Sequence, residues 1–176
     1  MIYQRLRLFS RDQRGFTILE MLVSVTLTAM LSLGASMASA QVLNETARNT
    51  DYTTASRQAM NAIYWISQDA QMAQVTLGTD VFPDAGDLVF SWTTWENEVD
   101  TVVYSITGSE LRRSYSVNGG EPVEIVVAGY INPDPGLTGC VMDDGRLSLK
   151  VTASVGEGDT VVNVTRTRDT ISRPNL

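Results

Sequence analysis

The sequence has no histidine and only one cysteine, Cys140. A chain without histidine cannot form a Ser-His-Asp or Cys-His nucleophile system, and it cannot supply a histidine ligand to a metal. A single cysteine cannot form a disulfide within the chain or complete a zinc site of four cysteines. The sequence also lacks a phosphate-binding glycine-rich loop and a nucleophile elbow. These absences exclude histidine-based catalysis and zinc sites made of histidine or of four cysteines, and we expect stability to come from packing or from assembly with other chains.

Basic residues are scarce and unevenly placed. The net charge is -7 over 176 residues. Residues 1–15 contain four arginines and one aspartate, a net charge of +3, whereas residues 16–176 contain nine basic and nineteen acidic residues, a net charge of -10. Because phosphate binding needs a basic surface, the acidic body argues against DNA or RNA as the main partner.

A long apolar run follows the basic head. Residues 16–40 contain one charged residue, Glu20, and one glycine, Gly34. As a helix this run would be about 37 Å long, enough to cross a hydrocarbon core of about 30 Å. Four arginines precede the run, and the next basic residue is Arg48. The positive-inside rule therefore predicts that residues 1–15 lie in the cytoplasm and that the acidic body lies outside.

The helical pattern continues beyond the apolar run. Residues 41–75 contain no proline or glycine, and apolar residues recur in them at spacings of three and four. This stripe consists of Tyr52, Ala59, Ile63, Ile66, Ala70 and Ala73. We predict one helix from about 17 to 75, apolar all round in its first half and amphipathic in its second half, with the first break at Leu77-Gly78.

The rest of the chain is typical of β-structure. Six runs rich in Val, Ile, Thr, Tyr and Trp are separated by glycine-containing turns. These runs are Asp87–Trp92, Thr101–Ile106, Leu111–Val117, Val123–Ile131, Arg146–Val155 and Thr160–Arg168. The short connections favour an antiparallel sheet. Residues 132–145 are expected to form a long irregular loop, and the tail after Arg168 is expected to be loose. The predicted fold class is α+β, a long N-terminal helix packed on a C-terminal antiparallel sheet.

The most informative segment reads Arg14-Gly15-Phe16-Thr17-Ile18-Leu19-Glu20. A carboxylate in an apolar helix is costly and therefore suggests a function. With its basic leader, Gly15, Phe16 and a glutamate four residues later, the segment resembles the type IV pilin family, which includes the pseudopilins of type II secretion. The resemblance implies cleavage between Gly15 and Phe16 by a membrane-embedded prepilin peptidase, and N-methylation of the new Phe16 amine. It also implies that Glu20 docks subunits by neutralising the amine of a neighbour.

The resemblance divides the chain into four parts. Residues 1–15 would be the leader that is removed, 16–40 the membrane-spanning half of the helix, 41–77 its amphipathic half, and 78–176 a β-rich head. The implied partners are other pilin or pseudopilin subunits, the prepilin peptidase, an inner-membrane assembly platform, and lipid before assembly. The implied location is the inner membrane, with one crossing and the N-terminus inside, followed by a cell-surface or periplasmic filament.

Within this family the chain resembles a minor subunit that primes assembly or forms part of the tip. The resemblance implies a structural protein that is not an enzyme and that binds no cofactor. It lacks the proline that commonly kinks the N-terminal helix of major pilins, and it lacks a C-terminal cysteine pair. In the family, the subunit at the extreme tip often lacks the glutamate, so Glu20 implies a subunit with another above it. Small residues, Gly34, Ala35, Ala38 and Ala40, would allow close helix packing in the filament.

Two alternatives remain from the sequence. Ala38-Ser39-Ala40 is an A-x-A site, so the apolar run can be read as a cleavable signal peptide before an exported soluble β-rich binding domain that begins at Gln41. A plain single-pass anchor is the other alternative, and it leaves Gly15, Phe16 and Glu20 unexplained.

The remaining signals are weak. Asp134, Asp143 and Asp144, or Asp80, Asp84 and Asp87, are calcium candidates, although no EF-hand spacing is present. Solvated turn carboxylates are the simpler interpretation. Cys140 is either a free thiol or a small apolar residue. All three tryptophans, Trp65, Trp92 and Trp95, are expected to pack in the core.

Overall fold

The structure is a computed structural model, and it describes residues 15–80, 82–84 and 86–172. The expected leader, residues 1–15, therefore lies outside the described residues except for Gly15. By its internal contacts the chain divides into two units, Met1–Glu45 and Thr46–Leu176. We describe each unit by itself.

One helix, α1, spans Ile18–Met72 and confirms the predicted long helix. It ends before residue 75 because residues 75–77 form a strand, with the N–H of Gln74 donating to the carbonyl of Ser91 at 2.9 Å. The predicted apolar stripe is buried from Ala59 onward. Tyr52 is the exception: it is 52% exposed, because the core begins at Ala55.

The first sheet, sheet A, contains five antiparallel strands in sequential order. Its strands are β1 (Val75–Leu77), β2 (Leu88–Thr93), β3 (Val99–Thr107), β4 (Glu110–Val117) and β5 (Val123–Ala128). Strand β1 was not expected from the sequence. The run predicted to continue to Ile131 ends at Ala128, and Ile131 forms a single bridge to Ala153 instead.

The second sheet, sheet B, contains three antiparallel strands, β6 (Gly139–Asp143), β7 (Arg146–Val155) and β8 (Val162–Ile171), with a 3₁₀ turn at Gly158–Thr160 before β8. Antiparallel pairing is therefore confirmed, but the strands form two sheets rather than one. The prediction that residues 132–145 are irregular throughout is wrong, because β6 pairs with β7. Strand β8 also continues past Arg168, where a loose tail was expected, because its last residues pair with the start of β7.

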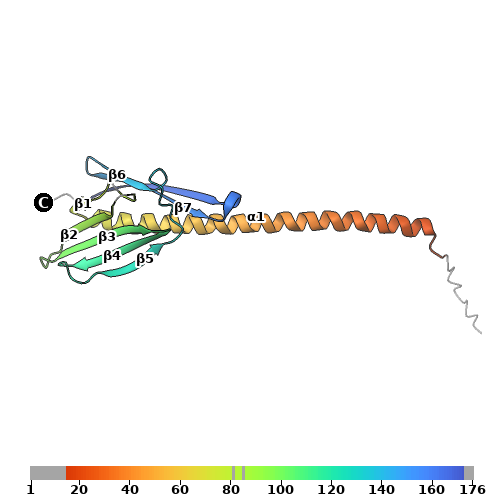
Figure 1. Ribbon diagram of the computed structural model, residues 1–176, viewed down its shortest axis with the longest axis horizontal. Helices are drawn as coiled ribbons and strands as arrows, with labels where there is room; N and C mark the ends of the chain where they lie inside the picture. Colours follow the sequence, from red (N-terminus) through yellow and green to blue (C-terminus); the bar gives the residue numbers. More distant parts are fainter. Residues whose placement is uncertain (1–14, 81, 85, 173–176) are drawn as a thin grey trace, which may run out of the picture. The chain divides into compact units, whose positions relative to one another are not determined.

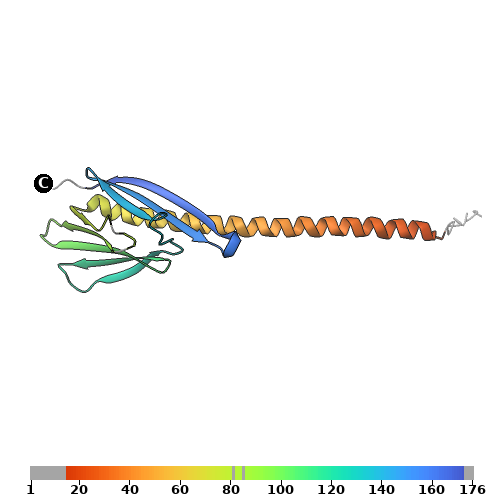
Figure 2. The same ribbon diagram turned by 45° about the horizontal axis from the view of Figure 1, so that its top comes forward.

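The core of the second unit lies where the end of α1 passes between the two sheets (Figure 1 and Figure 2). Alanines on α1 allow both sheets to approach the helix closely. Ala55, Ala59, Ala62 and Ala70 have no exposed surface. Large side chains come from the strands, among them the buried residues Leu88, Phe90, Tyr104, Leu111, Leu147 and Val151.

A buried ion pair joins α1 to sheet A. Arg113 on β4 donates to both carboxylate oxygens of Asp69, from Nε at 2.7 Å and from a terminal nitrogen at 3.0 Å. The hydroxyl of Tyr104 on β3 also donates to Asp69. The guanidinium of Arg113 lies over the rings of Trp65 and Tyr115, 5.3 and 5.5 Å from their centroids. Bidentate, charge-assisted bonds of this kind fix the orientation of both partners.

The aromatic and sulfur-containing side chains divide between core and surface. Trp92 is buried and Trp65 is partly buried, as expected. The expectation is wrong for Trp95, which is 92% exposed because it lies in the turn between β2 and β3. Cys140 is buried, and burial, followed by the nearby Asp80 carboxylate, raises the pKa of its thiol to about 12. Cys140 therefore fills space as a small apolar residue.

Candidate functional site

The residues singled out by the sequence, Gly15, Phe16 and Glu20, lie at the start of α1. Gly15, Phe16 and Thr17 precede the helix and have no regular secondary structure. Phe16 is 75% exposed, and a Cβ added at Gly15 would have no atom within 4 Å. The bond between Gly15 and Phe16 therefore lies in open, non-helical backbone, which is the form in which a peptidase can bind a chain.

Thr17 determines where the helix begins. Its Oγ1 accepts the N–H of Glu20 at 3.2 Å, and its carbonyl accepts the N–H of Met21 at 3.1 Å. A threonine followed three residues later by glutamate is a capping-box sequence. Sequence reasoning missed this cap, although the spacing of Thr17 and Glu20 is a signal that could have located it. The cap separates the predicted cleavage site from the helix that follows.

Glu20 lies in the first turn of α1, where the helix dipole favours a negative charge. Among the residues that the structure describes, no cationic group pairs with its carboxylate. The neighbouring side chains, including Leu19 and Met21, are apolar and exposed. The carboxylate thus lies on an apolar helix surface without a partner from the described part of its own chain.

The first half of α1 exposes apolar side chains all round, and α1 is the one helix among the described residues that is long and apolar enough to cross a membrane. The exposed residues include Ile18, Leu22, Val25, Leu27, Met30, Leu31, Leu33, Met37, Val42 and Leu43. A soluble protein rarely leaves so continuous an apolar surface in water. The proposed packing residues Gly34, Ala35, Ala38 and Ala40 are exposed on the same segment.

The hydroxyl groups in this half bond to the helix itself. Each serine and threonine between residues 18 and 40 donates to a backbone carbonyl three or four residues earlier, at 2.7 to 2.9 Å. These residues are Ser24, Thr26, Thr28, Ser32, Ser36 and Ser39. An unpaired hydroxyl is costly in hydrocarbon, and internal bonding removes that cost. The polar side chains of this segment are therefore compatible with an apolar surrounding.

The calcium candidates do not gather into a binding group. The side chain of Asp134 caps its own loop by accepting the N–H of Gly136 at 2.8 Å, while Asp143 and Asp144 lie at the turn between β6 and β7. Within the described ranges, no three side chains of His, Cys, Asp or Glu lie together so that they could hold a metal. Calcium binding by these carboxylates receives no support from the fold.

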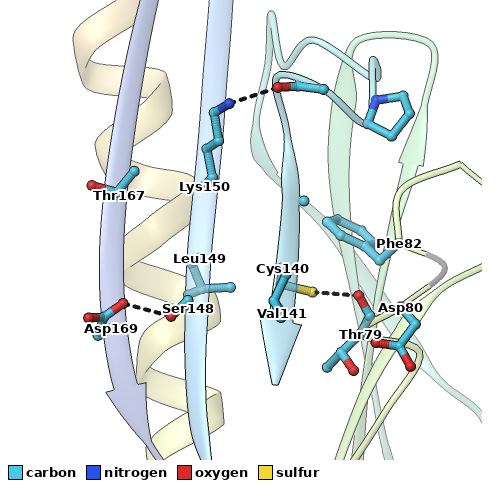
Figure 3. A pocket seen from close by; sticks show the side chains of 13 residues that line it. Thr79, Asp80, Phe82, Cys140, Val141, Ser148, Leu149, Lys150, Thr167 and Asp169 are labelled. Atoms are coloured by element: carbon cyan, nitrogen blue, oxygen red, sulfur yellow. Dashed lines mark hydrogen bonds between the residues drawn. The ribbon is translucent and has the colours of Figure 1, made fainter. Parts of the chain in front are cut away.

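A cavity of about 600 Å³ lies on sheet B beside Thr79, Asp80 and Phe82 (Figure 3). Some of its polar side chains are bonded within the chain. The amine of Lys150 donates to the carbonyl of Gly136 at 2.7 Å, and the hydroxyl of Ser148 donates to Asp169 at 2.9 Å. The Cys140 thiol, which also lines the cavity, points toward the carbonyl of Thr79. The Cys140 thiol is not activated as a nucleophile, because burial raises its pKa.

In the comparisons with known proteins, a family model matches the N-terminal end of the chain. Residues 10–36 match the model of the family described as the prokaryotic N-terminal methylation motif. No curated protein and no solved structure matches the chain. The matched range contains Gly15, Phe16, Glu20 and much of the exposed apolar half of α1. With the long apolar helix packed at its far end on an antiparallel β-domain, this motif supports a protein of the type IV pilin and pseudopilin family.

Proposed function

We propose that the chain is a prepilin that a prepilin peptidase cuts between Gly15 and Phe16 and that is then methylated on the Phe16 amine. The mature chain is a minor pilin or minor pseudopilin, a structural subunit that primes assembly or forms part of the tip of a type IV pilus or type II secretion pseudopilus. One observation carries the proposal: the methylation motif covers the start of a helix half whose large apolar side chains are exposed on all sides.

The exposed apolar surface of α1 occupies two apolar environments, one before assembly and one after it. Before assembly the first half of α1 lies in the inner membrane, crossing it once, with the basic residues 1–15 on the cytoplasmic side and the acidic head outside. After assembly the same surface packs against the helices of other subunits in a filament at the cell surface or in the periplasm. Hydroxyl groups that are bonded to their own helix suit both environments.

Glu20 sets the axial position of each subunit as its helix moves from the membrane into the filament. Cleavage creates a cationic amine at Phe16, and methylation keeps that charge. A cation and a carboxylate that are each costly in an apolar surrounding become tolerable as a pair. Among the described residues no cation pairs with Glu20, and the partner that we propose for it is the Phe16 amine of a neighbouring subunit. The head acts as a binding surface for its neighbours, as expected in a family of structural subunits.

The alternative, an exported soluble domain released at Gln41, fits the helix poorly. Helix α1 runs without interruption from Ile18 to Met72, so the bond between Ala40 and Gln41 lies inside it. Intact-mass measurement of the mature protein from the native host tests the proposal directly. A chain that begins at methylated Phe16 supports it, and a chain that begins at Gln41 overturns it in favour of the signal-peptide alternative.

A substitution sharpens this test. In Gly15→Val, the β-branched side chain obstructs the approach of peptidase groups to the scissile backbone, because glycine alone leaves that backbone uncovered. We expect no detectable cleavage and a full-length precursor in the membrane fraction. The matched control is Gly34→Val, which makes the same change in an equally open part of α1 and should be cut normally. Normal maturation of Gly15→Val would show that the cleavage site is elsewhere.

A further inference from the structure

The Thr17 hydroxyl competes with the Phe16 carbonyl for one backbone donor. In an α-helix each N–H donates to the carbonyl four residues earlier, so the N–H of Glu20 would donate to Phe16 if α1 began before Phe16. It donates instead to the Oγ1 of Thr17, at 3.2 Å. The carbonyl of Thr17 accepts the N–H of Met21 at 3.1 Å. The Thr17 side chain thus takes the donor that would draw Phe16 into the helix.

This competition affects the bond between Gly15 and Phe16. Among the residues that the structure describes, no backbone N–H donates to the carbonyl of Gly15. In a helix that ran through Phe16, this carbonyl would accept the N–H of Leu19. Hydrolysis adds the oxygen of a water molecule to the Gly15 carbonyl carbon and breaks the bond to nitrogen, which leaves a carboxylate on Gly15 and a protonated amine on Phe16. Negative charge develops on the carbonyl oxygen during the attack, so a peptidase needs that oxygen free.

Little else in the sequence stops the helix at this point. The chain has no proline before Pro83, so no strong helix breaker lies near the site. Glycine is a poor helix former, but Gly15 precedes Phe16 and does not prevent Phe16 itself from joining the helix. Threonine is favoured at the N-cap because its side-chain oxygen accepts a backbone N–H. The hydroxyl of Thr17 is therefore the group that fixes the start of α1 at Ile18.

From these bonds we infer that Thr17 is a positioning residue for cleavage of the precursor, because its hydroxyl holds the start of α1 at Ile18 and so keeps the Gly15 carbonyl available to the peptidase. The inference rests on the proposed function, which supplies the cleavage, and it adds a residue to the site at which the peptidase acts. Thr17 acts through the backbone of its neighbours, and its role requires no contact with the peptidase.

The role of Thr17 is separate from that of Glu20. The cap uses the backbone N–H of Glu20 and does not involve its carboxylate. Glu20→Leu therefore keeps the cap, whereas Thr17→Val removes the cap and keeps the carboxylate. We expect the first variant to be cut at the native rate and the second to be cut more slowly.

The test uses the full precursor in detergent micelles with the prepilin peptidase of the native host, and intact mass measures cutting between Gly15 and Phe16. Thr17→Val keeps the shape of threonine but removes the acceptor. We expect kcat/KM to fall by about two- to fivefold, the upper value corresponding to the loss of a cap of about 1 kcal/mol. The fall should appear in KM with kcat unchanged, because a chain that must unwind before it binds is competent for only part of the time.

Two further variants distinguish a cap from direct recognition of the threonine side chain. Thr17→Asn has a different shape but supplies an N-cap acceptor, and Thr17→Ser keeps the hydroxyl, so both should be cut like the native chain. The matched control is Thr28→Val, because the hydroxyl of Thr28 donates to the carbonyl of Ser24 within α1, at 2.7 Å, and its loss should leave KM unchanged. Cα chemical shifts measure the start of the helix, and Phe16 should become helical in Thr17→Val but not in Thr17→Asn.

Three results would overturn the inference: an unchanged KM in Thr17→Val, an equal loss in Thr17→Asn, or an equal loss in Thr28→Val. Each of them is measured against a native chain that is cut before Phe16, so the proposed function stands in all three cases. A native precursor that is not cut at this bond overturns the proposed function together with this inference, and its intact mass separates that case from the other three.

Discussion

The two halves of α1 differ in whether a carboxylate in an apolar surrounding has a partner within the described part of its own chain. Asp69, in the second half, is almost fully buried and receives three hydrogen bonds from Arg113 and Tyr104 of the same chain. Glu20, in the first half, lies on an apolar surface and has no cationic partner within the described ranges. Asp69 is therefore paired within the head, whereas the proposed function gives Glu20 its partner from a second subunit.

The hydroxyl groups show the same contrast in reverse. In the first half they all bond to their own helix, which leaves the segment independent of any neighbour. In the second half, Thr50 and Thr53 also bond to their own helix, but Ser67 is buried and its Oγ has no hydrogen-bond partner among the described residues. Under the proposed function, the first half exchanges one apolar environment for another, whereas the second half packs in the fixed environment of the head. We therefore expect substitutions in the second half to change the free energy of unfolding of the head, and Glu20 substitutions in the first half to change subunit docking.

The largest expected effect is in the second half. Arg113→Met removes the cation and leaves the Asp69 carboxylate buried with Tyr104 alone. Removing one member of a buried pair costs about 3–5 kcal/mol. We expect a loss of this size in the free energy of unfolding of the head, measured by denaturant titration. Arg146→Met, at the exposed and longer ion pair with Asp169, is the control and should change stability by less than about 1 kcal/mol. A small effect at Arg113 would show that the pair does not hold α1 on sheet A.

Glu20→Leu should weaken subunit docking and leave the stability of the head unchanged. Cleavage and membrane insertion should persist, because the carboxylate is beyond the cut and leucine is easier to insert. Docking should fail, since the neighbour's amine would meet an apolar side chain at a cost of about 3–5 kcal/mol. That cost corresponds to roughly two to three and a half orders of magnitude in affinity. Recovery of filament partners from solubilised membranes measures the loss.

Two controls separate docking from folding. Glu20→Gln should be milder, because an amide still accepts a hydrogen bond but carries no charge. The unfolding free energy of the head should be unchanged in both variants, because Glu20 belongs to the first unit. If Glu20→Leu matures and recovers partners as the native chain does, the charge-pair mechanism is wrong while the family assignment stands.

A smaller effect is expected at Tyr104. Burial first, and the Asp69 carboxylate second, raise the pKa of its hydroxyl far above its usual range. Tyr104→Phe removes a hydrogen bond to a charged group, at a cost of about 1.5–3 kcal/mol at neutral pH. In the unfolded chain the phenol ionises near pH 10, but in the folded chain it stays protonated. The stability that Tyr104 contributes is therefore complete below pH 10 and is lost as the pH rises further.

The measurement is the free energy of unfolding of the native chain and of Tyr104→Phe from pH 7 to 11. The two curves should approach each other above pH 10, with slopes that differ by about 1.4 kcal/mol per pH unit. Tyr64→Phe, at an exposed position on α1, controls for the loss of a phenol. Parallel curves over the whole range would show that Tyr104 ionises equally in both states.

Sequence reasoning predicted those parts of the fold in which apolar residues recur at a regular spacing. The spacing of Ala59, Ile63 and Ile66 is sufficient to define a helix face, and the structure buries that face. Strand β6 was missed because its residues lie in a stretch rich in glycine and proline, where local propensity is weak and pairing with β7 decides. Strand β1 was missed because three residues carry no period of their own.

Among the residues singled out in the structure, only those that belong to a local sequence motif could be predicted. Gly15, Phe16 and Glu20 could be chosen from the sequence, because their spacing is a motif that needs no tertiary contact. The ion pair of Asp69 and Arg113 could not be chosen, because forty-four positions separate the two residues and only the packing of α1 on sheet A joins them.

The smallest effect has the opposite sign and tests the contrast between the hydroxyl groups. Ser67→Ala removes a buried hydroxyl that has no partner in the described residues and places a better helix former in α1. We expect the head to become more stable by about 0.5–1 kcal/mol, measured by denaturant titration. Ser32→Ala, in the first half of α1, is the matched control and should leave the unfolding of the head unchanged, because Ser32 belongs to the first unit. A loss of more than about 1 kcal/mol in Ser67→Ala would mean that this hydroxyl has a partner, such as a buried water, and that polar groups in both halves of α1 are satisfied.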